Sequence, residues 1–165
     1  MAWQYLLYLL ALFVATAITT WLAIYAWQHR EVPEAPGFVA VMIGTTIWSL
    51  VLVLIYLSPS AAAARFWSRL WYTNAAFVPL AWLTFALYHT GQQRWLTMRR
   101  LLLLSSVPVF TVLSVWTDDL HGLFIRSLDF YPDGAFLLPE ISFGFGYIIH
   151  SLYSYALMTV GIILI

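Results

Sequence analysis

The chain has 165 residues, of which 63% are hydrophobic and 8% charged, with a formal net charge of zero. A soluble domain needs roughly 25% charged residues, so this composition excludes that class and predicts an integral membrane protein. Zero net charge with seven scattered arginines argues against a nucleic-acid partner, and the lack of cysteine excludes disulfides and thiolate chemistry.

Five apolar stretches are long enough to cross a bilayer, since a helical span needs about 20 residues. They lie near residues 3–27, 38–57, 70–88, 98–116 and 143–165. The first is a span rather than a secretory leader, because no positive residue precedes it and the apolar run continues past the apparent cleavage site. Trp and Tyr gather near the ends of the stretches, as interfacial anchoring predicts. The sequence therefore predicts one domain, residues 1–165, that is an all-α integral membrane helical bundle.

Two features of the later stretches carry further expectations. Pro108 removes a backbone donor from the fourth stretch, so a neighbouring helix, Ser105 or Ser106 must compensate. The fifth stretch is still apolar at Ile165, without a polar flank or a basic anchor. We therefore expect residue 165 to mark a truncation rather than a true terminus.

Orientation follows from the arginines in the short loops, because basic loops resist translocation. The loops on one side carry Arg30, Arg94, Arg99 and Arg100, and those on the other carry Arg65, Arg69 and Arg126. Four against three favours a multi-pass protein with an external N-terminus and a cytoplasmic C-terminus.

The longest loop, residues 117–142, contains two β-prone runs around the turn sequence "YPDG". Pro, Asp and Gly are typical turn residues, so a small external hairpin is predicted here. The loop opens with "TDDLHGLF", residues 117–124, where Asp118, Asp119 and His121 are crowded together. Three interpretations stay open: a solvated loop whose acids cap the fourth helix, a ligand-sensing mouth, or a metal site. No established ligand spacing supports the metal.

His150 lies one or two turns inside the fifth stretch, on the same side as His121. An ionisable group within a membrane indicates a functional site by default, although an interhelical hydrogen bond is the structural alternative. Asn74, in the third stretch, has the same two interpretations. We expect His121 and His150 to share one outer cavity with Asp118 or Asn74 nearby. Its apolar walls are predicted to include Trp116, Phe143 and Tyr147.

Four segments of the chain resemble the N-terminal seven-transmembrane sensor region of bacterial histidine kinases. They are "TTIWSLVLVL" (45–54), "WYTNAAFVPLAWLTFALYHTG" (71–91), "VPVFTVLSVWTDDLHGLF" (107–124) and "GYIIHSLYSYALMTVGIIL" (146–164). The chain departs from the family pattern at Asn74, where the family has Gly, and at Asp118, where it has Asn. It also has five spans instead of seven.

The resemblance implies a truncated seven-helix sensor module that performs no chemistry itself. It implies signal reception in a two-component system, through a small ligand or a membrane state, with His121 and His150 at the outer rim. Kinase activity would reside in a cytoplasmic part, and the full-length kinase would be a homodimer. The chain has no phosphoacceptor histidine motif and no Gly-rich nucleotide loop.

Two other functional classes remain open from the residues alone. One is a subunit of a membrane redox complex, with haem or a chlorin ligated by histidine; the predicted depths limit bis-histidine ligation to His121 with His150. The other is an accessory structural subunit that has no ligand. We expect the chain to bind no cofactor, and haem or a chlorin is the alternative.

Overall fold

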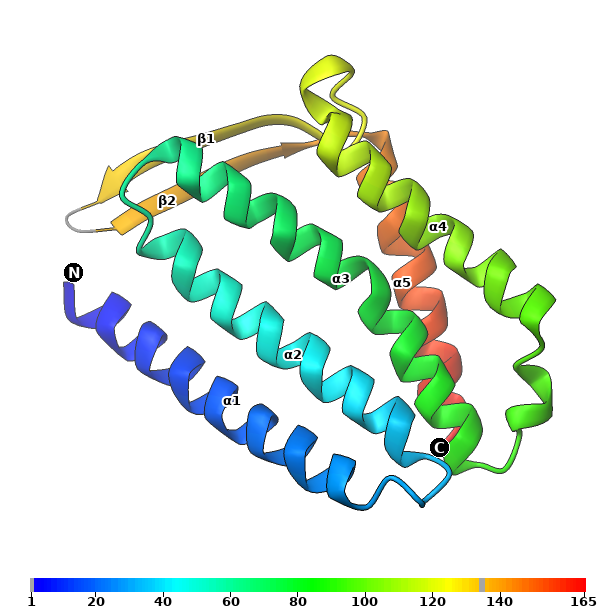
Figure 1. Cartoon of the computed structure of the whole chain (residues 1–165). Helices are drawn as coiled ribbons and strands as arrows, with labels where there is room; N and C mark the ends of the chain where they lie inside the picture. The colour runs from blue at the N-terminus through cyan, green and yellow to red at the C-terminus, as the bar shows by residue number, and fades with distance from the viewer. Residues whose placement is uncertain (1, 134–135) are drawn as a thin grey trace.

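The computed structural model describes residues 2–133 and 136–165 and has five long helices and one β-hairpin (Figure 1). The helices are α1 (Ala2–Gln28), α2 (Ala35–Tyr56), α3 (Ala61–His89), α4 (Met98–Thr117) and α5 (Phe145–Leu164). The strands are β1 (Ile125–Asp133) and β2 (Phe136–Phe143). All five helices are long and apolar enough to cross a membrane. The prediction of a five-span helical bundle with a small hairpin is confirmed.

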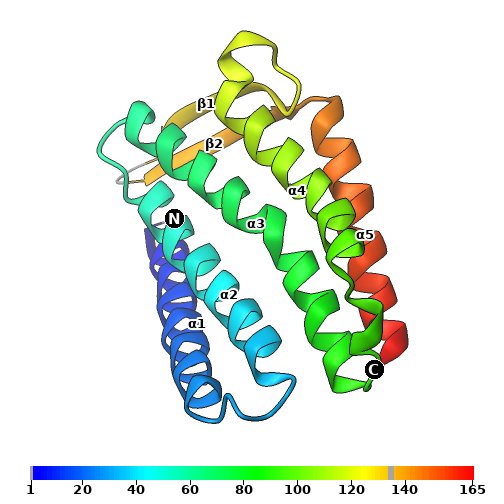
Figure 2. The ribbon, with the colours of Figure 1, turned by 45° about the vertical axis from the view of Figure 1, so that its right-hand side comes forward.

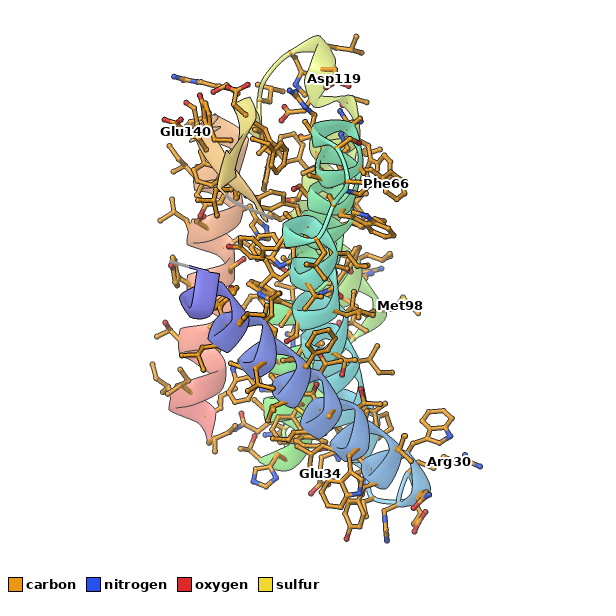
Figure 3. All side chains as sticks on the ribbon, turned by 90° about the vertical axis from the view of Figure 1, so that its left-hand side faces the viewer. Arg30, Glu34, Phe66, Met98, Asp119 and Glu140 are labelled. Atoms are coloured by element: carbon orange, nitrogen blue, oxygen red, sulfur yellow. The ribbon has the colours of Figure 1, made fainter. Side chains whose placement is uncertain are left out.

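The helices run up and down between two ends of the bundle (Figures 1 and 2). The hairpin end carries the hairpin and the α4–β1 connection, and the opposite end carries the α1–α2 and α3–α4 loops. Figure 3 shows Asp119 and Glu140 at the hairpin end and Arg30 and Glu34 at the opposite one. Short connections join α1 to α2, α2 to α3 and α3 to α4, as is usual for antiparallel neighbours, whereas the hairpin joins α4 to α5.

Helix α3 is the centre of the bundle and packs against α2, α4 and α5, whereas α1 packs chiefly against α2. The buried share of the span is 39% for α3 and 11% for α1. Close approach of α2 to α3 depends on glycine: a Cβ on Gly37 would lie 2.8 Å from the Cα of Phe85, and one on Gly44 would lie 2.8 Å from Val78. Small residues at such contacts are typical of helix packing in membranes.

Each packed pair of helices is joined by at least one side-chain hydrogen bond. The bonds are Thr19–Thr46 (α1–α2), Asn74–Gly44 (α2–α3), Trp116–Thr73 (α3–α4), Trp82–Met158 (α3–α5), and Tyr153–Leu104 and Thr111–His150 (α4–α5). The Tyr153 hydroxyl donates to the carbonyl of Leu104 at 2.9 Å. Pro108, four residues on, has no N–H for that carbonyl, so a neighbouring helix compensates as expected.

Helix α3 begins at Ala61, nine residues earlier than the predicted span at residue 70. The Ser60 side chain accepts a hydrogen bond from the N–H of Ala63 and so caps the helix. The alanine run that follows favours helix over loop. These nine added residues place Arg65 and Arg69 beside the α4–β1 connection, where both line one cleft.

The hairpin presents one apolar and one polar face. Leu128 is buried opposite Ile141, and both belong to the cluster that caps the bundle. On the other face, Asp129 is paired with Glu140 and both are exposed. The Glu140 carboxylate raises the pKa of the Tyr131 hydroxyl through its charge and a hydrogen bond. The hairpin therefore covers the bundle with its apolar side and presents acidic groups to solvent.

Candidate functional site

The segment 117–124 is organised by the carboxylate of Asp118. Helix α4 ends at Thr117, a short 3₁₀ turn follows, and Gly122 has φ +59, which reverses the chain. The buried Asp118 carboxylate then accepts hydrogen bonds from the backbone N–H groups of Phe124, at 2.9 Å, and Ile125. These bonds satisfy donors that would otherwise be buried without partners. Asp118 therefore closes the turn between α4 and β1.

The same turn is attached to the start of α5. The carbonyl of Phe124 accepts from the N–H of Gly144 at 2.9 Å, and that of Leu123 accepts from the N–H of Gly146 at 2.7 Å. A Cβ on Gly144 would collide with the carbonyl oxygen of Leu123. Glycine is therefore required at this crossing of two backbones, and the end of α4 and the start of α5 are fixed to each other.

His121 uses both ring nitrogens inside this turn. Its Nδ1 accepts a hydrogen bond from the N–H of Leu123 at 3.0 Å, and its Nε2 lies 2.9 Å from the Thr117 hydroxyl. The Thr117 hydroxyl donates to the carbonyl of Leu113, so it is free to accept from Nε2. We assign the neutral Nε2–H tautomer from this network. The Asp118 oxygen, 3.5 Å from Nδ1, is the longer contact.

An outer cleft of about 380 Å³ opens beside this turn, between the beginning of α3 and β1. Its charged lining consists of Arg65, Arg69, Arg126, Asp118 and Asp119, and His121 also lines it. The Arg69 guanidinium donates to the Asp119 carboxylate at 2.5 Å. Among the residues that the structure describes, no three His, Asp or Glu side chains form a group able to hold a metal ion.

His150 is buried in a different place, between α4 and α5. Its Nδ1 lies 3.3 Å from the Thr111 hydroxyl and its Nε2 lies 3.2 Å from the Ser154 hydroxyl. The ring of Phe124, which is completely buried, lies 6.0 Å from the imidazole between ring centroids. One neutral histidine offers one donor and one acceptor, and either hydroxyl can take either role. His150 is thus an interhelical link as well as a pocket residue.

The interhelical pocket beside His150 has a volume of about 470 Å³ and lies between α2, α3, β2 and α5. Its walls are mainly apolar and rich in aromatic rings, which include Trp48, Trp71, Tyr72, Phe143 and Tyr147. The Tyr147 ring stacks on Phe143 at 3.8 Å between centroids. The buried indole N–H of Trp71 has no hydrogen-bond partner among the described residues. An apolar pocket with a few polar groups is typical of a small-molecule site.

The structure brings together only part of the predicted set. His150, Tyr147 and Phe143 line the interhelical pocket, whereas Asp118 and His121 line the outer cleft. The two lining sets share no residue, so the expectation of one cavity with both histidines is corrected. The physical reason is the turn itself, because its hydrogen bonds hold His121 against Thr117 and Leu123, where the side chain lines the outer cleft.

Two predicted residues lie outside both pockets. Asn74 donates to the carbonyl of Gly44 at 2.8 Å and therefore faces α2. The Trp116 indole N–H donates to the Thr73 hydroxyl at 3.0 Å, and its ring packs against Phe66. Both expectations are corrected in favour of helix packing, because each side chain finds its polar partner on a neighbouring helix.

Several residues of both pockets were not predicted. Ser154 follows His150 by four positions, a spacing that places both side chains on one helix face. Arg65 and Arg69 have the same spacing. Those two signals were present in the sequence, whereas the contacts of Thr111 and Phe124 with His150 required the relative rotation of α4 and α5.

We predict that Asp118→Asn lowers the free energy of unfolding by about 1–3 kcal/mol. The asparagine side chain has one oxygen that can accept from one backbone N–H, but its NH₂ group would face the second backbone N–H. Asp119→Asn is the matched control: that carboxylate is largely exposed, so its loss should cost less than about 1 kcal/mol. Denaturation in detergent micelles, followed by tryptophan fluorescence, compares the two. Equal effects would contradict the structural role of Asp118.

A model of the family described as "N-terminal 7TM region of histidine kinase" matches residues 11–165. Among curated proteins and among solved structures, none matches the chain significantly. The match covers nearly all of the chain. The five helices are long and apolar enough to cross a membrane, as a transmembrane region requires. The chain belongs to the family of N-terminal seven-transmembrane regions of histidine kinases, the membrane-embedded sensory part of these proteins.

Proposed function

We propose that the chain receives a signal by binding a small lipophilic molecule in the interhelical pocket beside His150. The observation that carries this proposal is one buried imidazole at the edge of an aromatic pocket, between two helices that it links. Burying a polar group in a membrane is costly, so such groups mark functional sites by default. The chain belongs to a family of sensory membrane regions, and this supports signal reception as the role of the pocket.

The chemistry of the pocket indicates the class of ligand. Its aromatic walls favour an apolar body. The Trp71 N–H lacks an acceptor among the described residues, and Trp71 belongs to the pocket wall. The hydroxyl of Ser154 and the imidazole of His150 add exchangeable hydrogen bonds. A molecule with an apolar ring or chain and a carbonyl-type acceptor fits these features.

Transmission follows from the position of His150. Helices α4 and α5 meet through the Thr111–His150 and Tyr153–Leu104 hydrogen bonds. A ligand that competes for His150 shifts the balance between two arrangements of these helices, provided that it binds the two with different affinity. The chain itself is not catalytic; phosphoryl transfer would belong to a kinase part of the intact protein, acting as a homodimer.

Placement in the membrane is part of the proposal. The end with the α1–α2 and α3–α4 loops holds Arg30, Arg94, Arg99 and Arg100, one arginine more than the hairpin end. We place this end in the cytoplasm and the hairpin and N-terminus outside the bacterial inner membrane.

We also propose that the protein functions without bound haem or chlorin. Both ring nitrogens of His121 and both of His150 have hydrogen-bond partners within the chain. The two histidines line separate pockets, whereas bis-histidine ligation needs them on opposite faces of one macrocycle. We expect the purified protein to show no Soret band in its visible absorption spectrum. A Soret band lost in His150→Ala would favour the redox alternative.

Single-cysteine variants test the orientation cleanly, because the chain contains no cysteine. Ser142 is exposed on the hairpin and Gln93 is exposed in the α3–α4 loop. The two variants are Ser142→Cys and Gln93→Cys. In spheroplasts, an impermeant maleimide should label Ser142→Cys at once and Gln93→Cys only after lysis. The reverse order would overturn the orientation.

His150→Leu tests the proposed pocket in the intact protein. We expect autophosphorylation in membrane vesicles to change by about fivefold or more, the usual lower range of coupling between sites, while membrane insertion stays normal. His29→Leu, an exposed histidine beyond the end of α1, is the control and should leave phosphorylation unchanged. Unchanged phosphorylation in His150→Leu would reduce His150 to a structural link. Wild-type protein without any autophosphorylation would overturn the kinase role.

A further inference from the structure

The outer cleft gathers three of the seven arginines of the chain. Arg65 and Arg69 lie one turn apart on α3, so their side chains leave the same face of the helix. Arg126 reaches the cleft from β1, where a bulge shifts the strand register between Ile125 and Ser127. Two elements distant in the sequence therefore contribute arginines to the lining of one cleft.

Two of these guanidinium groups are not neutralised. Arg69 pairs with Asp119. Among the residues that the structure describes, neither Arg65 nor Arg126 has a carboxylate within ion-pair distance. Asp118 does not neutralise them either, because its carboxylate is buried and accepts from two backbone N–H groups. Three positive and two negative side chains leave a formal charge of +1 in the cleft.

The Arg69–Asp119 pair shows which group the cleft accepts. A guanidinium presents parallel donors that match the two oxygens of a carboxylate or phosphate. The Asp119 side chain is 74% exposed and that of Arg69 27% exposed, so the carboxylate is the partner that is free to leave. A competing oxyanion would take the place of Asp119 on Arg69 and add contacts to Arg65 and Arg126.

We propose that the outer cleft binds an oxyanion, a carboxylate or phosphate group, between Arg65, Arg69 and Arg126, with Asp119 as an intramolecular competitor. The volume of about 380 Å³ suits a small acid or a single head group. The anion comes either from a soluble molecule outside the membrane or from an anionic lipid at the rim of the bundle. This site is separate from the pocket at His150, and its occupancy is measurable whatever the signalling role of the chain.

The experiment uses the protein in nanodiscs of zwitterionic lipid and titrates it calorimetrically with succinate and with inorganic phosphate at fixed ionic strength. A second set of nanodiscs contains phosphatidylglycerol. The variants are Arg65→Gln, Arg126→Gln and Asp119→Asn. Two controls carry the same charge changes outside the cleft: Arg94→Gln at the opposite end, and Asp129→Asn on the outer face of the hairpin.

We expect saturable binding of at least one probe in zwitterionic lipid, weakened about tenfold in Arg65→Gln and Arg126→Gln and unchanged in Arg94→Gln. Asp119→Asn should tighten binding about threefold, in the range of an exposed ion pair, while Asp129→Asn should not. Each variant is compared in the two kinds of nanodisc. If phosphatidylglycerol weakens probe binding in the wild type but not in Arg65→Gln, the anion is a lipid head group. Absence of saturable binding and of lipid competition, or equal effects of cleft and control variants, would overturn the proposal.

Discussion

The hydrogen bonds of the Asp118 carboxylate with the backbone of Phe124 and Ile125 determine the arrangement of the hairpin end. They close the turn that Gly122 makes after α4, from which β1 crosses the bundle. They also bring the carbonyls of Leu123 and Phe124 to the start of α5. Both pockets border this turn: Asp118 lines the outer cleft, and the Phe124 ring packs beside His150. Without that carboxylate, the backbone N–H groups of Phe124 and Ile125 would need other partners.

A related constraint applies to the rest of the bundle, because polar groups within a bilayer need partners inside the protein. The Trp71 N–H is an exception among the described residues. Hydroxyls bond to their own helix or cross to the next one, as Thr19 and Thr46 do between α1 and α2. The carbonyl left free by Pro108 is bonded by Tyr153. His150 follows the same rule with Thr111 and Ser154. What distinguishes His150 is that its imidazole also lines the interhelical pocket.

Sequence patterns predicted the features that depend on one element at a time. Apolar length indicated the five spans, and the two β-prone runs indicated the hairpin. The "YPDG" turn was placed too early, because Tyr131–Asp133 belong to β1, and the turn itself lies outside the described residues. Contacts between elements were less accessible. Asn74 and Trp116 lie at plausible depths, yet their side chains turn toward α2 and α3, because depth along a helix says nothing about its rotation. His121 and His150 were separated for a similar reason, since the hydrogen bonds that hold His121 involve a left-handed turn at Gly122.

Phe124 stands between two pockets that share no lining residue. Its backbone N–H donates to the carboxylate of Asp118, which lines the outer cleft. Its ring contacts Tyr72, Tyr147 and His150. Trp48 and Tyr155 line only the interhelical pocket, and Arg65 and Arg126 line only the outer cleft. The walls of the two pockets can therefore change independently of each other during evolution, while Phe124, which adjoins both, keeps its contacts.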